Sequence, residues 1–270
     1  MMRSGKIRIK KYKTGHHKGL ILLLLLPAAA AALYFLAGSG KITLPSFTLP
    51  SFSKEDMQQE TRVITLEGGK AFALQLGAFS EKSGADALAK SFISRGAAGY
   101  VHQQEGYRVL AAAYHTREEA AAVQNRLSDQ HGVDVYIYPL ARSTVTLRLT
   151  GRKAQLDALS DAWDMLLQLS STLAHLSQSL DEGSMETEEI MQALSSQKET
   201  VQALQSRMLS LFPKEEHTAV TALSGLMNSL HTHLSSALAA ENATRLGSRI
   251  KYCQLFVLCE TERYVNSLIP

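Results

Sequence analysis

The chain has 270 residues, of which 45% are hydrophobic, with 28 Lys and Arg against 25 Asp and Glu. Seven of the 28 basic residues lie within residues 1–18, which contain no acid, so the remainder holds 21 basic against 25 acidic residues. The positive charge therefore belongs to the N-terminal tail, and the rest of the chain is not expected to bind nucleic acid. The length suits about two domains.

An apolar stretch without a charged residue runs from Leu20 to Ala37. Since a membrane-spanning helix needs roughly 17–25 residues, this stretch is long enough to cross a bilayer. The basic tail before it predicts an N-terminus in the cytoplasm. The alternative is a cleaved signal peptide with its cut site at residues 37–39, although the apolar run is longer than such segments usually have. In either case the bulk of the chain is expected outside the cytoplasm, and the uncleaved helix would hold it at the cell membrane as a single-pass protein.

A spacer with two prolines, Pro45 and Pro50, follows the apolar stretch and contains Leu-Pro-Ser-Phe twice. Short proline-bearing segments of this kind are extended and pack poorly. We therefore expect a basic cytoplasmic tail at residues 1–18, a transmembrane signal-anchor helix at 19–38, and an extracytoplasmic linker at 39–69.

Residues 70–140 contain one pattern twice. Gln75-Leu-Gly-Ala-Phe79 and Leu110-Ala-Ala-Ala-Tyr114 begin 35 residues apart, and a run with helical spacing follows each. A period in this range marks a duplicated supersecondary unit, here strand, turn, helix and strand. Two copies predict a small α+β domain in which two helices cover one face of a four-stranded sheet.

The expected strands lie at residues 71–76, 98–103, 107–114 and 133–138. Pro139 is expected to end the last strand. The first helix is expected at 80–95. Thr116 and Glu119 are spaced as the capping box of the second helix, which Gly132 ends.

Strand alternation assigns the two faces of this sheet. Phe72, Leu74 and Leu76 alternate with Ala73 and Gln75, so the large apolar set faces the helices. By the same alternation and by the symmetry of the repeat, the residues expected to point away from the helices are Tyr100, His102, Arg108, Leu110, Ala112, Asp134, Tyr136 and Tyr138. This outward face is expected to be open to solvent.

Residues 151–270 have a different composition, rich in Leu, Ser, Gln and Ala. Leu159, Leu166, Leu173 and Leu180 fall seven residues apart, and further apolar stripes follow. Each stripe needs a partner helix, which predicts an antiparallel bundle of three or four helices. A short strand at 143–150 would extend the small sheet or lead into the bundle.

The motifs Gln75-Leu-Gly-Ala-Phe79, Gly106-Tyr-Arg-Val109 and Thr116-Arg-Glu-Glu-Ala120, in this order, resemble a SPOR domain, the sporulation-related repeat. The resemblance covers about residues 70–140. It implies a βαββαβ fold similar to an RNA-recognition module, and binding to peptidoglycan glycan strands stripped of their stem peptides. Such proteins are typically single-pass membrane proteins at bacterial division septa. The second copy departs from the family, because Ala112-Ala-Tyr114 stands where Gly-Pro-Phe is usual.

The outward face suits a neutral polysaccharide, because aromatic rings can lie against sugar C–H faces while an amide and a guanidinium supply donors and acceptors. The expected glycan-binding residues are Gln75, Arg108, Leu110, Tyr100, Tyr136 and Tyr138.

The C-terminal half shows no catalytic signature: its histidines fit no zinc-ligand spacing. We expect a non-catalytic protein of the division or sporulation septum without cofactor or metal. Its partners would be glycan strands, the membrane through Leu20 to Ala37, and an envelope protein on the bundle. A wall hydrolase targeted by the SPOR-like module and a morphogenetic scaffold remain alternatives. Cys253 and Cys259 are interpreted as core thiols, with a disulfide as the alternative.

Overall fold

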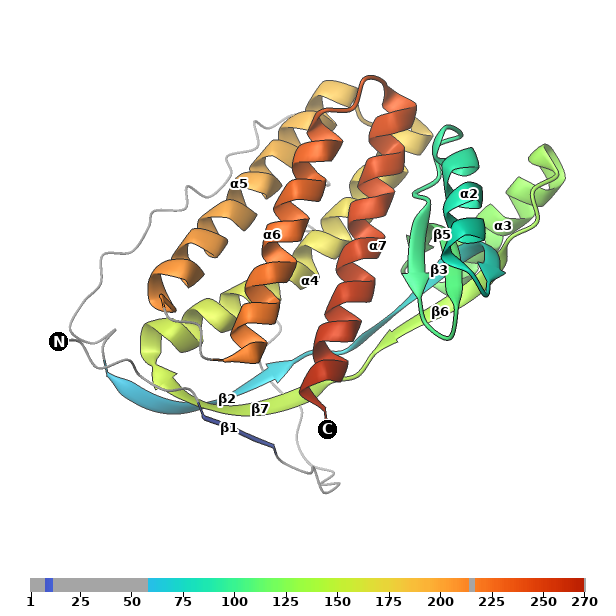
Figure 1. The fold of residues 1–270 in the computed structure, drawn as a ribbon. Coiled ribbons are helices and arrows are strands. Elements are labelled where there is room, and N and C mark those ends of the chain that lie inside the picture. Colours follow the sequence, from blue (N-terminus) through green and yellow to red (C-terminus); the bar gives the residue numbers. More distant parts are fainter. Residues whose placement is uncertain (1–7, 12–57, 214–216, 270) are drawn as a thin grey trace.

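The computed structural model describes residues 8–11, 58–213 and 217–269. Two helices, a four-stranded sheet and a helical bundle lie against one another in that order (Figure 1). The predicted small α+β domain and helical C-terminal part are confirmed. The expected anchor, from Leu20 to Ala37, lies outside the described residues. Within the described residues, no helix has both the length and the apolarity that a membrane crossing requires.

The four-stranded sheet has the order β4-β5-β3-β6, and all neighbouring strands are antiparallel. Its strands are β3 (Gly69–Phe79), β4 (Tyr100–Gln103), β5 (Tyr107–Tyr114) and β6 (Tyr136–Arg142). Helices α2 (Lys82–Ile93) and α3 (Arg117–His131) cover one face. The duplicated unit therefore has the predicted βαββαβ order.

The face toward α2 and α3 is packed by the predicted side chains. Leu74 packs with Ala120 of α3, and Val109 packs with Ala85 and Ala89 of α2. The α3 helix also begins as predicted, because the Thr116 hydroxyl accepts from the main-chain N–H of Glu119 at 3.1 Å. These local signals were sufficient to predict both helices.

Strand β6 extends past the residue expected to end it. Pro139 lies inside β6, opposite Phe72 of β3, and the strand continues to Arg142. The prediction that Pro139 ends this strand is wrong. Because β6 is an edge strand, alternate N–H groups face away from the sheet, so a proline can be accommodated without losing a ladder bond.

A second sheet of order β1-β7-β2 continues the first. Its strands are β1 (Arg8–Lys11), β2 (Gln59–Leu66) and β7 (Val145–Arg152). β2 leads into β3, and β6 leads into β7. The β2–β7 pair and the β3–β6 pair therefore form one long bent ribbon beneath the bundle (Figure 1). The strand expected near residues 143–150 is confirmed. Residues 59–66, expected within the linker, instead form a strand paired with β7.

The ribbon bends at Gly68. A Cβ atom there would lie 2.6 Å from the main-chain oxygen of Arg142 and 2.8 Å from the main-chain nitrogen of Thr144. Only glycine allows the two strands to approach this closely at the bend. The bend turns the ribbon from the small sheet toward the bundle.

Four helices form the bundle: α4 (Lys153–Glu182), α5 (Thr187–Leu211), α6 (Thr218–Leu238) and α7 (Ala243–Leu268). α4 contacts α5 and α7, and α6 lies between α5 and α7. The predicted antiparallel bundle is confirmed, with Leu166 and Leu173 fully buried on its first seam. Cys253 and Cys259 are buried and unpaired, as expected of core thiols, and burial raises the pKa of Cys253 to about 12.

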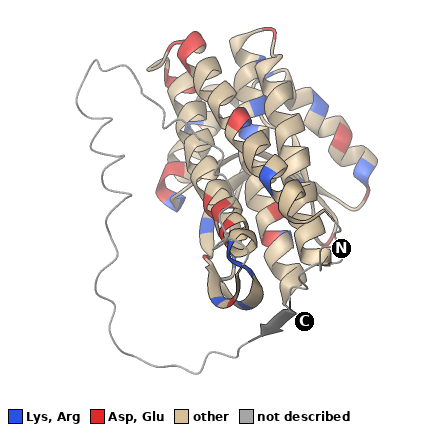
Figure 2. Ribbon diagram, turned by 90° about the vertical axis from the view of Figure 1, so that its left-hand side faces the viewer, with Lys and Arg blue, Asp and Glu red and all other residues tan. Residues whose placement is uncertain are grey.

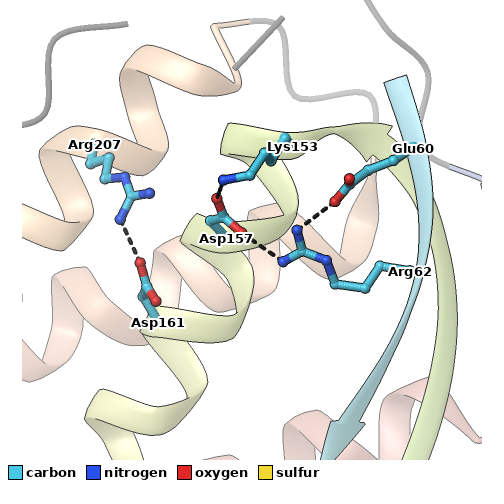
Figure 3. A network of polar contacts seen from close by, with 6 residues as sticks. All are labelled: Glu60, Arg62, Lys153, Asp157, Asp161 and Arg207. Carbon is cyan, nitrogen blue, oxygen red and sulfur yellow. Dashed lines mark hydrogen bonds and ion pairs between the residues drawn. The ribbon is translucent and has the colours of Figure 1, made fainter. Parts of the chain in front are cut away.

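Ion pairs attach the ribbon to the bundle (Figure 3). Arg62 of β2 donates from Nη1 to Oδ1 of Asp157 on α4 at 2.6 Å, and Lys153 lies 3.0 Å from the same carboxylate. A second pair, Arg207 with Asp161 at 2.5 Å, joins α5 to α4. Partly exposed pairs of this kind contribute at most about 1 kcal/mol each.

Candidate functional site

Helix α7 lies across the sheet face that is opposite α2 and α3 (Figure 1). Beneath it Leu110 is fully buried and Tyr100 keeps 5% of its surface exposed. The Tyr100 hydroxyl donates to Oε1 of Glu260 at 3.2 Å, and the Gln254 side chain donates to the main-chain oxygen of Ala113 at 3.1 Å. Most of this face therefore belongs to the core of the bundle.

The prediction of an open outward face is wrong for Tyr100 and Leu110, which α7 covers. Alternation distinguishes the two faces of a strand, but it does not say whether a helix or solvent lies beyond the second face. The sequence did contain a signal: Ala71, Ala73 and Ala98 lie on this face and are buried with α7. Such small side chains let a helix backbone approach a sheet closely.

Two bulges determine which residues share the outward face. Register shifts lie on both sides of Gln75 in the β3–β5 pair. As a result Ala112 is opposite Leu74, and Ala113 packs with the bundle in the outward position expected for Ala112. Gln75 itself is opposite Tyr136 of β6. The predicted alternation is correct up to the bulge and shifted by one residue beyond it.

Around the β4–β5 turn the sheet is covered less completely, because Gln104 and Tyr136 are exposed and Gln75, Arg108 and Tyr138 are half-buried. We name this part of the sheet the open end and define it by Gln75, Gln104, Arg108, Tyr136 and Tyr138. Arg108 donates from Nη1 to Oε1 of Gln75 at 3.1 Å, and its guanidinium lies 4.8 Å from the centre of the Tyr138 ring. The Tyr138 hydroxyl donates to Oε1 of Gln104 at 2.5 Å, and Tyr136 is 68% exposed.

The open end therefore unites four of the six predicted site residues. Arg108 is fixed between an amide and an aromatic ring, and its Nε atom is buried without a hydrogen-bond partner among the described residues. Burial raises the pKa of Tyr138 and the nearby Arg108 opposes this rise, so the hydroxyl stays protonated at neutral pH. The arrangement offers ring faces, an amide and hydrogen-bond donors, which together suit a neutral polar ligand.

Two neighbours of Arg108 were not among the predicted site residues. Gln104 lies in the β4–β5 turn, where alternation assigns no face, and it connects Tyr138 to the edge of the sheet. His102 was expected on the outward face but is 5% exposed, and its Nε2 lies 3.2 Å from Oε1 of Gln104. Burial lowers the pKa of His102, although the bond with Gln104 opposes this shift. Both residues support the position of Tyr138.

The charge distribution agrees with a neutral ligand. In the view of Figure 2, basic and acidic positions are scattered over the helices and do not form a face of one sign. A surface of that kind does not concentrate a polyanion by its field.

Comparison with known proteins identifies one region of the chain. Residues 68–139 match the family model of the SPOR domain. No curated protein and no solved structure matches the chain. The matched residues run from the ribbon bend to Pro139, so they contain the whole open end and none of the bundle.

Proposed function

We propose, from the premise that residues 68–139 are a SPOR domain, that this chain binds the glycan strands of peptidoglycan at the open end of its sheet. SPOR domains are peptidoglycan-binding modules, usually of cell-division proteins. The observation that carries the proposal for this chain is Arg108, which is fixed between Gln75 and Tyr138, while Gln75 is paired with the exposed Tyr136.

The arrangement of the open end suggests how a glycan would lie. A sugar ring packs its C–H face against Tyr136, whose exposed ring has an apolar body and a polar tip. Hydroxyl and acetamido oxygens of the next sugar accept from the donors of Arg108 that Gln75 leaves free. Stem peptides would prevent a strand from lying flat here, so the ligand is a strand from which they have been removed.

The same family and the sequence support a proposal for the cellular role. We place the protein in the cell membrane through the stretch from Leu20 to Ala37, with the SPOR domain and bundle outside the cytoplasm and concentrated at the division or sporulation septum. The protein acts by binding and not by catalysis, and the bundle is a surface for another envelope protein.

The test is co-sedimentation of the full-length chain with purified sacculi, with and without prior amidase digestion. Digestion is expected to increase the bound fraction, and Arg108→Ala to weaken binding at least tenfold, since a hydrogen bond to a charged group contributes roughly 1.5–3 kcal/mol. Arg126→Ala is the matched control, because this exposed residue lies on α3, on the opposite side of the sheet. Equal binding by wild type and Arg108→Ala would reject the open end as the site.

A second function, as a morphogenetic scaffold, is favoured by one observation. Tyr100 and Leu110 lie under α7, so the sheet has less free surface than an uncovered SPOR domain. Glycan binding would then be weak, and the chain would act through a protein bound to its bundle. Absence of sedimentation with amidase-treated sacculi would favour this scaffold, and a clearing band in zymography would favour a hydrolase.

A further inference from the structure

A cavity of about 240 Å³ lies where the ribbon bend, the small sheet and the bundle meet. Its wall comes from the start of β3, the end of β6, α4 and α7. A single water needs only ~10–15 Å³, whereas pockets for drug-sized ligands begin at roughly 300 Å³. The cavity therefore suits a small molecule. It does not include any residue of the open end.

Two cations line this cavity, the exposed Lys70 and the half-buried Arg142. Arg142 donates from Nη1 to Oγ1 of Thr261 at 2.9 Å and from Nε to the main-chain oxygen of Glu67 at 3.1 Å, and its guanidinium lies 5.2 Å from the centre of the Trp163 ring. These partners are neutral, and Arg142 forms no ion pair with any described residue. Burial lowers the pKa of Arg142, and the nearby carboxylate of Glu262 opposes this shift. A guanidinium has five N–H donors, so donors remain for a bound anion.

Glu262 of α7 lines the same cavity and constrains the nature of that anion. It forms no hydrogen bond or ion pair with the described residues. Burial raises the pKa of Glu262, while Arg142 and Arg263 lower it. An anion that approached Arg142 would also approach this carboxylate, and like charges repel. A ligand with one negative and one positive group satisfies both side chains.

Two buried neutral side chains supply further acceptors. Gln254 is 1% exposed and uses its Nε2 for the Ala113 carbonyl, which leaves its Oε1 without a partner among the described residues. Ser170 of α4 is 7% exposed, and its hydroxyl forms no hydrogen bond within the described part of the chain. Both side chains line the cavity. The two oxygens are not among the buried side-chain atoms that lack a partner, so they are accessible and can accept hydrogen bonds from a polar occupant of the cavity.

We propose that this cavity binds an amino-acid-sized zwitterion, with its carboxylate on Arg142 and its ammonium group facing Glu262, Gln254 and Ser170. The ligand would contact β6, α4 and α7 together, and thus join the SPOR domain to the bundle. Because only the folded protein has this cavity, binding would raise the midpoint of thermal unfolding.

The test is thermal unfolding and isothermal titration of the purified full-length chain with each common amino acid at millimolar concentration. At least one amino acid is expected to raise the unfolding midpoint and to bind saturably. Its N-acetyl derivative lacks the ammonium group and its amide lacks the carboxylate, and both should bind at least tenfold more weakly.

Two variants identify the site. Ser170→Leu fills the cavity from α4 and should abolish binding, while Glu262→Gln keeps the shape and should make the amino acid bind no better than its N-acetyl derivative. Arg108→Ala is the control, because it should lose sacculus binding and keep amino-acid binding. The proposal is overturned if no amino acid binds the wild type, or if folded Ser170→Leu binds normally. If Ser170→Leu does not fold, unchanged selectivity of Glu262→Gln overturns it.

Discussion

The side-chain amide of Gln254 on α7 donates to the main-chain oxygen of Ala113 on β5 at 3.1 Å. Gln254 is buried, with 1% of its surface exposed. β4 pairs with β5 only from Tyr107 to Leu110. Helix α7 thus supplies the partner that the shorter strand does not reach, and the sheet and the bundle share one buried core on this side. The SPOR domain of this chain is therefore built into a larger folding unit.

Replacing Gln254 with Leu is expected to lower the free energy of unfolding by about 1–3 kcal/mol, because the buried Ala113 carbonyl loses its partner. Urea denaturation followed by circular dichroism and by fluorescence of Trp163, the single tryptophan, measures the change. Because the core is shared, both probes should report one transition. Gln178→Leu on the exposed side of α4 is the control, and two separated transitions in the wild type would contradict the shared core.

Leu110 and Arg108 are close on β5, but truncating them should have different effects. Truncation of Leu110 should mainly reduce stability, and truncation of Arg108 should mainly reduce sacculus binding. Leu110→Ala removes a fully buried side chain and is expected to cost about 2–5 kcal/mol of stability, while the folded fraction still binds sacculi. Arg108→Ala should reduce sacculus binding with a much smaller loss of stability. Urea midpoints together with co-sedimentation measure both effects. Loss of binding by fully folded Leu110→Ala would mean that the glycan contacts the covered part of the sheet.

The sequence allowed the helix-facing half of the small domain to be predicted, because Leu74, Val109 and Ala120 follow strand and helix periods that depend only on local geometry. The covering of the opposite face could not be predicted this way. It depends on α7, whose first residue lies more than a hundred positions after Leu110, and periodicity contains no information on such distant pairing. The bulges beside Gln75 were also invisible, since they become defined only when β3 and β5 pair.

Two histidines near the contact between α7 and the sheet should make stability depend on pH. Burial lowers the pKa of His102 and of His233, and Glu260 opposes the shift in both. Around these rings, Arg108 and Arg263 add positive charge near His102, while His233 packs on Tyr252 and Phe256. Below about pH 6.5 these histidines bind protons more readily in the unfolded chain than in the folded protein. Protonation therefore does not reduce the free energy of unfolding well above that pH, and reduces it increasingly as the pH falls.

Urea midpoints at about pH 7.5 and about pH 5.5 measure this effect. His233→Phe keeps the aromatic contacts and should reduce the loss between the two pH values. The elevated pKa of Glu262 acts in the opposite direction, because that carboxyl gains a proton more readily in the folded protein as the pH falls. The informative quantity is therefore the difference between wild type and variant, and an identical pH dependence would refute a contribution from His233.

The pairing of β1 with β7 provides a test of the proposed membrane anchor. Lys10 is the register partner of Arg148, and the stretch from Leu20 to Ala37 separates β1 from the rest of the chain. If this stretch spans a bilayer, β1 and β7 of one chain lie on opposite sides of it and cannot pair. Cysteines at positions 10 and 148 should then form no disulfide within a chain in intact bacteria, but should form one in the purified protein without a membrane. Cysteines at Thr61 and Thr150, partners in the β2–β7 pair whose hydroxyls are 2.8 Å apart, should cross-link in both settings. An intrachain bond between positions 10 and 148 in intact cells would rule out the membrane-spanning arrangement.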